Sequence, residues 1–497
     1  MDTKNLSRRD FLRLSAMTAA GLAVAPYVVG TPGLAQAASA AAPKAADVTL
    51  DVMSLAEYEG PYKEIWGVFE EENPGIKVNV FSINEDTAAA YEAKVAGGYL
   101  PAIELTQETQ IFFKKDNYQM AVDLSTVDFQ WWDRWTYDVK NAWSALFGGL
   151  PGPRSLDCFQ GYVITWQYNT EIMEKAGLNP QKDVKTLADL EKWLDEGTAF
   201  AKASGGEVEW FWNQSWHNWV FGVGYAELTT LPFVDGARAR TADCWLGKAK
   251  FNAEDSPYRH YFEFWLKAKD KGWIPENMPS RLWEGDMEAS YIAGKSAMML
   301  HGPWVWDKAL AAGSAFATAG HQDGLPAFPP ADGQEVWLQG ALPPNIDNQW
   351  WMREGEQKLP IWPQIVTAWN WFWSPGAIPM KAQAEGRVPL YKLDEPLDLK
   401  GPQYQKVLKY IGDANGPYPN TKYEQGWTGM VLSSPYRKKG SKGVFDWESN
   451  GNNAVFTDLF AGKLTVQGAL DIAQKNWDAS FEGLPDANAP ALPAVPG

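Results

Sequence analysis

Alternating hydrophobic and polar positions over 47–54 mark the first regular element of the chain and predict a strand. Apolar residues then recur at helical spacing over 62–69, and Asn73-Pro74-Gly75 is expected to end that helix. "GIKVNVF" (75–81) returns to the strand pattern. Strand, helix and strand in this order predict a right-handed parallel unit and an α/β lobe.

A third strand is predicted at "PAIELT" (101–106), after a helix over 86–96. The polar residues Gln107, Glu108 and Thr109 follow it directly. Ligand crevices in open parallel sheets lie at the carboxyl ends of the strands, so these three residues are candidate ligand contacts. A solvated loop is the alternative.

Two later segments carry helix start signals. Thr186 and Asp189 have the spacing of a capping box, and leucines repeat on one face to about residue 203. Thr465 is expected to cap another helix, whose shared face comprises Val466, Leu470, Ala473 and Trp477.

The stretch "YIAGKSAMMLHGPWVW" (291–306) contains a Gly-Lys-Ser that suggests a phosphate loop. Such a loop needs a glycine five positions earlier, where this chain has Ala289, so the motif fails. What remains is a short apolar strand over 297–300 and a Gly-Pro turn before two tryptophans. Trp304 is interpreted as a ligand platform, with core filler as the alternative, and Trp306 as core.

Aromatic residues are unusually frequent, with 27 Trp, 19 Tyr and 22 Phe. A core needs fewer tryptophans, and the excess favours a surface that stacks on sugar rings while offering indole N–H donors. Trp369, Trp371 and Trp373 alternate with other residues, so as a strand they would share one face. That face is either the floor of a lobe or the lining of an oligosaccharide groove.

Acidic residues dominate the charge, with a net value of −17, which argues against nucleic acid or anionic lipid as a partner. Glu284, Asp286 and Glu288 invite a glycosidase interpretation, because such enzymes need two carboxylates about 5–10 Å apart. Acidic residues are so abundant that a pair at this distance arises by chance. A solvated helix start is therefore the favoured interpretation.

The N-terminus has the features of an export signal. "SRRDFL" (7–12) is a twin-arginine pattern before a short apolar run, and small residues at 35–37 suit cleavage. We therefore expect a signal peptide over 1–37, a flexible leader over 38–46 and a periplasmic protein. The two cysteines and four histidines form no close-spaced ligand motif, so no metal or cofactor is expected. The first cysteine is Cys158, so no lipid-anchored cysteine is expected either.

Four phrases occur in an order that resembles one family: "EIWGVFEEENPGIKV", "YNTEIMEKAGLNPQKDVKTLADLEKWLDE", "YIAGKSAMMLHGPWVW" and "TDLFAGKLTVQGALDIAQKNW". The chain is similar from about 47 to 485 to the type 1, maltose-binding-like extracellular solute-binding proteins, which deliver sugars to ABC importers. The resemblance implies a two-lobed periplasmic-binding-protein fold of type II, α/β in class. Its hinge is crossed more than once, near 162–168 and 337–343, and the lobes close on the ligand.

On this resemblance the chain divides into seven segments. They are a signal peptide (1–37), a leader (38–46), the first part of lobe 1 (47–163), the first part of lobe 2 (164–336), a return mainly to lobe 1 (337–435), C-terminal helices mainly in lobe 2 (436–485) and a disordered tail (486–497).

The resemblance also implies ligand contacts. It places Trp304 at a sugar-stacking position, Trp216 near a second platform and Tyr162 at the first crossover. The loop after the first strand offers Glu57 and Tyr58. Gln107, Glu108 and Thr109 lie where relatives contact sugar hydroxyls, although the aromatic residue often found there is absent, and Trp369 is added from the aromatic pattern.

Three functions follow as hypotheses. The first is a non-enzymatic, carbohydrate-binding component of an ABC importer, with an oligosaccharide as the expected ligand. It is expected to be monomeric and partnered by the permease subunits. The second is a secreted glycan-active hydrolase or lyase, which the acidic, Trp-rich composition suits equally. The third is a binding protein for a polyamine or other non-sugar solute, because aromatic cages and carboxylates hold cations.

Overall fold

The computed structural model describes residues 48–55, 58–83, 101–107, 121–135, 138–140, 152–159, 163–216, 241, 243–302, 304–326, 337–340, 348–385, 387, 389–395, 397, 422–424, 444 and 454–481. The segments assigned from sequence to the signal peptide, the leader and the C-terminal tail lie outside these residues, as does the helix expected over 86–96.

The first sheet has the strand order β2-β1-β3-β9. Its strands are β1 (Val48–Leu55), β2 (Ile76–Ile83), β3 (Ile103–Gln107) and β9 (Asn348–Met352). β1 pairs in parallel with both β2 and β3, as the strand–helix–strand pattern predicts. β9 returns from much later in the chain and pairs antiparallel with β3.

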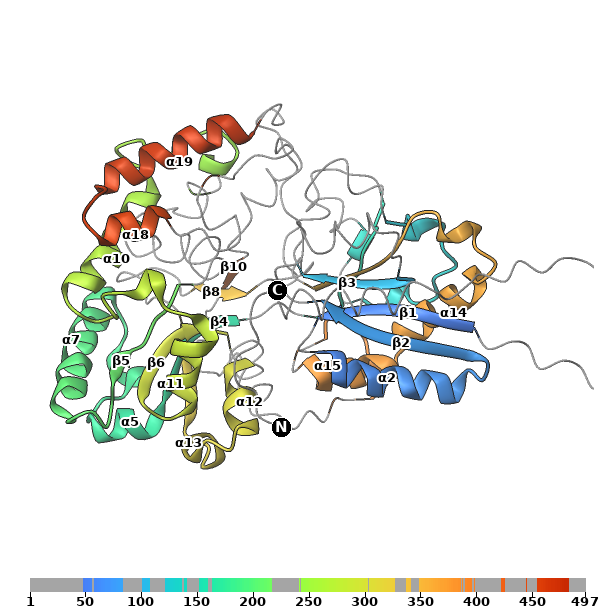
Figure 1. Cartoon of the computed structure of the whole chain (residues 1–497), viewed down its shortest axis with the longest axis horizontal. Coiled ribbons are helices and arrows are strands. Elements are labelled where there is room, and N and C mark those ends of the chain that lie inside the picture. Colours follow the sequence, from blue (N-terminus) through green and yellow to red (C-terminus); the bar gives the residue numbers. More distant parts are fainter. Residues whose placement is uncertain are drawn as a thin grey trace, which may run out of the picture. The chain divides into compact units, whose positions relative to one another are not determined.

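Helix α2 (Glu59–Glu72) connects β1 to β2 and buries the apolar face expected from its periodicity, Tyr62, Ile65, Trp66 and Phe69. Gly75 follows with a φ of 101°, a left-handed conformation that suits glycine and lets the chain turn into β2. Helix α15 (Ala377–Glu385) lies with α2 on one face of this sheet (Figure 1). These elements enclose the first hydrophobic core.

The strand interpretation of 369–373 is wrong. These residues end helix α14 (Trp362–Phe372), with Trp373 as its C-cap. Pro363 in the first turn pre-sets the helical φ, and Ile365, Ala368, Trp369 and Phe372 form one apolar stripe. Trp371 lies off that stripe and its Nε1 donates to Glu72 at 2.6 Å. The alternation was misleading because aromatic residues occupy both faces of the helix.

The second sheet has the order β10-β8-β4-β6-β5, and β7 also pairs with β4. Its strands are β4 (Val163–Asn169), β5 (Trp210–Trp212), β6 (Ser296–His301), β7 (Gln322–Pro326), β8 (Trp337–Gly340) and β10 (Lys422–Glu424). All of β6 is buried, and it pairs antiparallel with β4 and parallel with β5.

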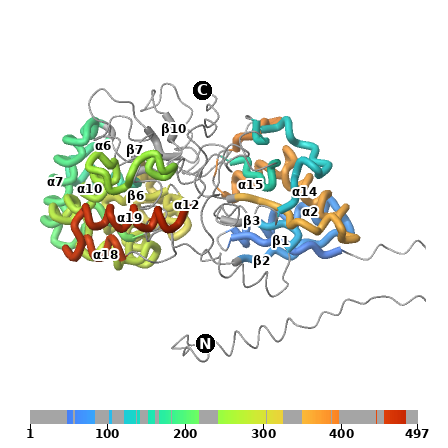
Figure 2. Tube along the Cα trace, turned by 90° about the horizontal axis from the view of Figure 1, so that it is seen from above, coloured from blue at the N-terminus to red at the C-terminus, as the bar shows by residue number. Residues whose placement is uncertain are grey.

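A second core forms around helices α5 (Thr170–Lys175), α7 (Leu187–Ala203), α10 (Pro257–Asp270), α18 (Ala454–Phe460) and α19 (Val466–Ser480). The predicted capping box of Thr186 and Asp189 is present, and Thr465 caps α19 by accepting from the backbone N–H of Gly468. The C-terminal helices α18 and α19 lie beside α10 (Figure 2).

The chain passes between the two cores at least three times. Phe159 belongs to the first core and β4 to the second sheet, so the first passage precedes Val163. The second lies between β8 and β9, which places 337–340 with the second sheet although the sequence assigned 337–435 mainly to lobe 1. The third precedes β10, which pairs with β8.

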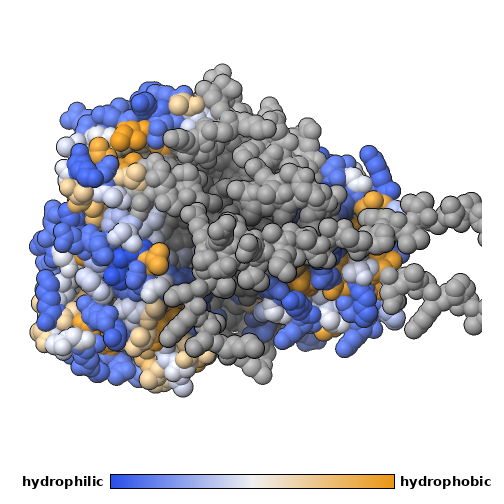
Figure 3. All heavy atoms as spheres, viewed as in Figure 1, coloured by the Kyte–Doolittle hydropathy of each residue, from blue (hydrophilic) through white to orange (hydrophobic). Residues whose placement is uncertain are grey.

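These cores contain a larger share of the tryptophans than we expected from the composition. Among the described residues, thirteen tryptophans are at most 3% exposed: Trp66, Trp135, Trp166, Trp193, Trp212, Trp245, Trp265, Trp273, Trp306, Trp350, Trp351, Trp369 and Trp373. Several pack edge-on or tilted against one another, such as Trp166 on Trp212 and Trp369 on Trp373. Trp66 stacks on Phe372 with centroids 4.9 Å apart. The described surface is mainly hydrophilic on the face seen in Figure 3. High Trp content is therefore largely a property of the interior.

Candidate functional site: a tryptophan pair around a buried carboxylate

Trp304 is the first residue of helix α12 (Trp304–Ala311), three residues after β6 ends. Its ring lies over Gly302: a Cβ on that glycine would come within 1.6 Å of the indole Cζ3. The indole is half-buried, and its centroid lies 4.8 Å from the ring of His301. Trp306 is 1% exposed and lies in the core, as expected. The glycine before the proline therefore makes room for the Trp304 ring.

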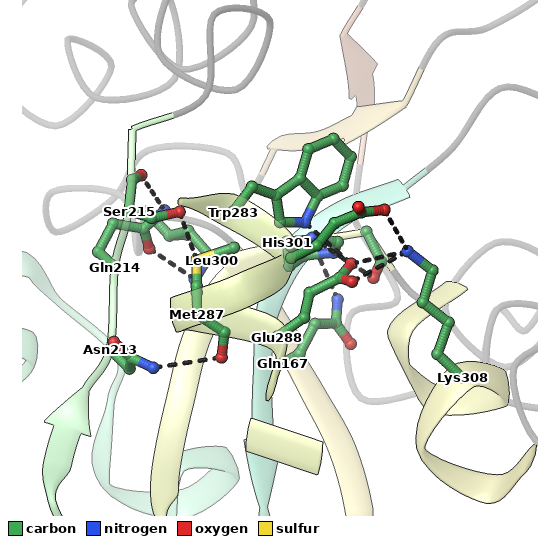
Figure 4. A network of polar contacts seen from close by, with 12 residues as sticks. Gln167, Asn213, Gln214, Ser215, Trp283, Met287, Glu288, Leu300, His301 and Lys308 are labelled. Carbon is green, nitrogen blue, oxygen red and sulfur yellow. Dashed lines mark hydrogen bonds and ion pairs between the residues drawn. The ribbon is translucent and has the colours of Figure 1, made fainter. Parts of the chain in front are cut away.

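The buried carboxylate of Glu288 contacts His301, the residue whose ring lies against Trp304 (Figure 4). Glu288 is only 3% exposed, and it ends a π-helical turn over Trp283–Glu288. The indole Nε1 of Trp283 donates to its Oε1 at 2.9 Å, and Lys308 Nζ donates to both oxygens at 2.9 and 3.1 Å. His301 Nε2 lies 3.1 Å from Oε1. The solvated interpretation is therefore wrong for Glu288, although it holds for Glu284, whose side chain is 79% exposed.

The electrostatics keep Glu288 ionised. Burial raises the pKa of this carboxyl, but the close contact and charge of His301 and the charge of Lys308 outweigh burial and lower the pKa to about 2. The Nδ1 of His301 lies 3.1 Å from the Gly302 carbonyl oxygen, which can only accept, so Nδ1 carries a proton. The contact of Nε2 with the carboxylate is attractive when that nitrogen is protonated as well.

Side chains after β5 form a second polar group in the same lobe. The Gln214 side chain accepts from Trp212 Nε1 at 2.9 Å and from the Leu300 backbone N–H at 3.1 Å. Asn213 donates to the Ser296 hydroxyl and accepts from Arg281. These contacts fix the segment that leads to Trp216.

Trp216 is half-buried and packs against the second core, with its ring 4.9 Å from Phe456. Tyr58, in the other lobe, lies at the start of α2 with its ring 6.2 Å from Tyr62. Trp369 is fully buried in the first core, 5.6 Å from Trp373, so it offers no exposed ring face. Among the predicted contacts that the structure describes, only Trp304 joins the Glu288 group, through His301.

Several predicted contacts lie outside the described residues: Glu57, Glu108, Thr109 and Tyr162. Gln107 ends β3, where its backbone pairs with Asn348. Sequence reasoning did not select Glu288, His301 or Lys308 as site residues. The available signal was the five-residue spacing of Trp283 and Glu288. Side chains at this spacing lie on the same helix face only in a π turn.

The described part of the chain shows no metal-ligand cluster, no disulfide and no helix suited to span a membrane. No group of three or more His, Cys, Asp or Glu among the described residues could hold a metal ion. Cys158 and Cys244 are not joined to one another, since each is a buried thiol in a different core. No helix in the described segments has the length and apolar content to cross a membrane.

Comparison with known proteins decides the family. The sequence profile described as "Bacterial extracellular solute-binding protein" matches residues 68–351, more than half of the 497-residue chain. The protein belongs to this family. No curated protein matches the sequence significantly.

This solute-binding protein shares its fold with solved structures of low sequence identity. A chitin oligosaccharide binding protein superposes with a TM-score of 0.63 at 16% identity, over 87% of this chain and 99% of the other. A sugar transporter from Bacillus licheniformis, in complex with stachyose, gives 0.58 at 16%, over 87% and 100%. A protein described for xylan utilization in Caldanaerobius polysaccharolyticus gives 0.62 at 15%, over 86% and 99%.

These matches confirm the two-lobed, maltose-binding-like fold of type II that the resemblance implies. The family consists of binding proteins, and its extracellular character means that the protein is exported.

Proposed function

We propose that the protein is the substrate-binding component of an ABC importer and that it captures an oligosaccharide by closure of its lobes, without chemistry. The observation that carries this proposal is Trp304. Its indole is half-buried, is backed by the His301 ring and follows a strand end at a glycine that leaves room for it. A pyranose presents a flat apolar face, and an indole is the side chain best suited to stack on it.

Proteins of the same fold support the choice of ligand class. The similar structures named above are described with chitin oligosaccharide, stachyose and xylan utilization, and another is a complex with raffinose. Each description concerns that protein. Chitin oligosaccharide, stachyose and raffinose are oligosaccharides of neutral sugar units, and we extend that class to this chain.

The remaining parts of the proposal concern delivery. The twin-arginine pattern at 7–12 would direct export, cleavage near 37 would release a freely diffusing periplasmic monomer, and the closed lobes would present a surface to the permease subunits. N-terminal sequencing of the exported protein tests the cleavage site, and substitution of Arg8 and Arg9 by Lys tests the export route.

A thermal-shift screen of residues 38–497 tests the binding function. The panel holds raffinose, stachyose, chitin and xylan oligomers, and spermidine. A ligand present at a hundredfold excess over its Kd adds ~2.7 kcal/mol to the stability of the folded state and raises Tm. We expect one oligosaccharide class to raise Tm and to remain intact on chromatography. Shifts by spermidine alone would favour a cation-binding protein, and new sugar products would favour a hydrolase or lyase.

A further inference from the structure

Trp283 and Trp304 form a corner of two aromatic rings. Their centroids are 6.4 Å apart and their planes meet at 61°. The two indoles come from different elements, Trp283 from the π-helical turn and Trp304 from the start of α12, and both are half-buried. One ring alone would bind a flat face, whereas two rings at this angle contact a sugar on a face and on an edge.

Glu288 is linked to both rings, to Trp283 directly and to Trp304 through His301. It accepts the indole N–H of Trp283 directly, at 2.9 Å. It reaches Trp304 through His301, whose ring lies 5.1 Å from Trp283 and 4.8 Å from Trp304. Figure 4 shows the nitrogen of Trp283 turned toward Glu288 and its six-membered ring turned away from the polar contacts.

The carboxylate is itself held firmly. Lys308 binds both of its oxygens, and the Lys308 ammonium also lies 5.6 Å from the Trp283 ring centroid. The backbone of His301 is anchored in turn, since its carbonyl accepts from the Gln167 side chain at 3.0 Å. A buried carboxylate with several donors has little freedom, so it can fix the groups bonded to it.

The charges of the group indicate the class of sugar. Lys308 is paired with Glu288, and Glu284 lies 3.7 Å from the same ammonium. The one ammonium of this group faces two carboxylates, so no positive charge within the group is left over to select an acidic sugar.

We propose that Glu288 is a positioning residue that holds Trp283 and Trp304 as a corner for one ring of a neutral oligosaccharide. This inference rests on the proposed function for its ligand, and on the contacts of Glu288 alone for the geometry.

Fluorine NMR of protein labelled with 5-fluorotryptophan tests the geometry without any ligand. Trp283→Phe and Trp304→Phe assign the two resonances. Glu288→Gln is expected to shift both, because the amide cannot pair with Lys308 and His301 as the carboxylate does. Glu284→Gln, in the same turn but exposed, is the matched control and is expected to shift neither. Unchanged resonances in folded Glu288→Gln would overturn the positioning role.

Titration with stachyose and with a chitin tetrasaccharide tests the ligand. Glu288→Gln is expected to lose about tenfold in affinity for whichever sugar binds, and Glu284→Gln less than about twofold. If Glu288→Gln does not fold, Trp283→Phe serves instead, because it keeps a ring but removes the indole N–H; a similar loss is expected. Wild-type affinity in these variants, or a preference for oligogalacturonate over both neutral sugars, would overturn the inference.

The two claims fail in different ways. If the wild-type protein binds no sugar in the panel, the proposed function fails, and the ligand assignment of the corner is overturned with it. The fluorine shifts in Glu288→Gln then decide the positioning role alone: shifts at both indoles support it and shifts at neither overturn it.

Discussion

The ring of Trp304 occupies the space that a side chain on Gly302 would need. A Cβ there would overlap three indole carbons at 1.6 to 2.2 Å, so the glycine is required by the ring and not by the turn alone. The two residues, separated by Pro303, therefore form one unit: the glycine makes the position of the indole possible.

Gly302→Ala is accordingly expected to displace the Trp304 ring and to weaken sugar binding by about tenfold or more, since stacking depends on ring placement. Isothermal titration with the sugar found in the screen measures the loss. Gly67→Ala is the control, because nothing lies within 4 Å of a Cβ at that glycine. Equal affinity in the two variants would show that ring placement is unimportant.

Substitution of two tryptophans of α12 should affect different properties, ligand affinity in one case and stability in the other. Trp304→Ala removes a half-buried ring, so ligand affinity should fall by a factor of about five or more while Tm changes little. Trp306→Ala empties a core position that is 1% exposed, so the free energy of unfolding should fall by ~3–5 kcal/mol. Urea unfolding and titration of both variants separate the effects, and a large stability loss in Trp304→Ala would instead make it a core residue.

Glu288 should stabilise the protein in a defined pH range. Its pKa is lowered from 4.5 to about 2 in the folded state, the net result of burial and of its partners His301 and Lys308. A lowered folded-state pKa gives stability that is complete above the unfolded value near 4.5 and is lost as pH falls toward 2. The stability difference between wild type and Glu288→Gln should therefore shrink over this range. A constant difference from pH 6 to 2 would contradict the assignment.

Glu356 should have the opposite effect on the pH dependence of stability. Burial first, and then the charge of Glu104, raise its pKa to about 9, with Arg353 opposing. The folded protein therefore keeps a proton that the unfolded chain releases near 4.5, so stability falls as pH rises from about 4.5 to 9. Glu356→Gln has no such proton and should be the more stable form at pH 8. Urea unfolding at pH 5, 7 and 9 checks this, and parallel curves for the two proteins would refute it.

The sequence predicted elements best where one local signal was sufficient. The unit of β1, α2 and β2, the capping box at Thr186 and the cap at Thr465 all depend on short-range spacing, and all are present. The 369–373 segment was misassigned because tryptophans on both faces of α14 hide the helical period.

The candidate site was harder to predict, for two physical reasons. Composition cannot distinguish a tryptophan that builds a core from one that contacts a ligand, and thirteen of the tryptophans that the structure describes are almost fully buried. Glu288 turns inward because the helix before α11 (Ala289–Ile292) is a π turn, and the five-residue spacing of Trp283 and Glu288 indicates this only once that turn is known. Its partners His301 and Lys308 are 13 and 20 residues away, beyond the reach of spacing rules.

The most direct measurement is isothermal titration of residues 38–497 with stachyose, raffinose and chitin and xylan oligomers, repeated with Trp304→Ala. The account predicts saturable binding of at least one of these neutral oligosaccharides, weakened in the variant and without turnover of the sugar. Binding of spermidine with no response to any oligosaccharide would contradict it.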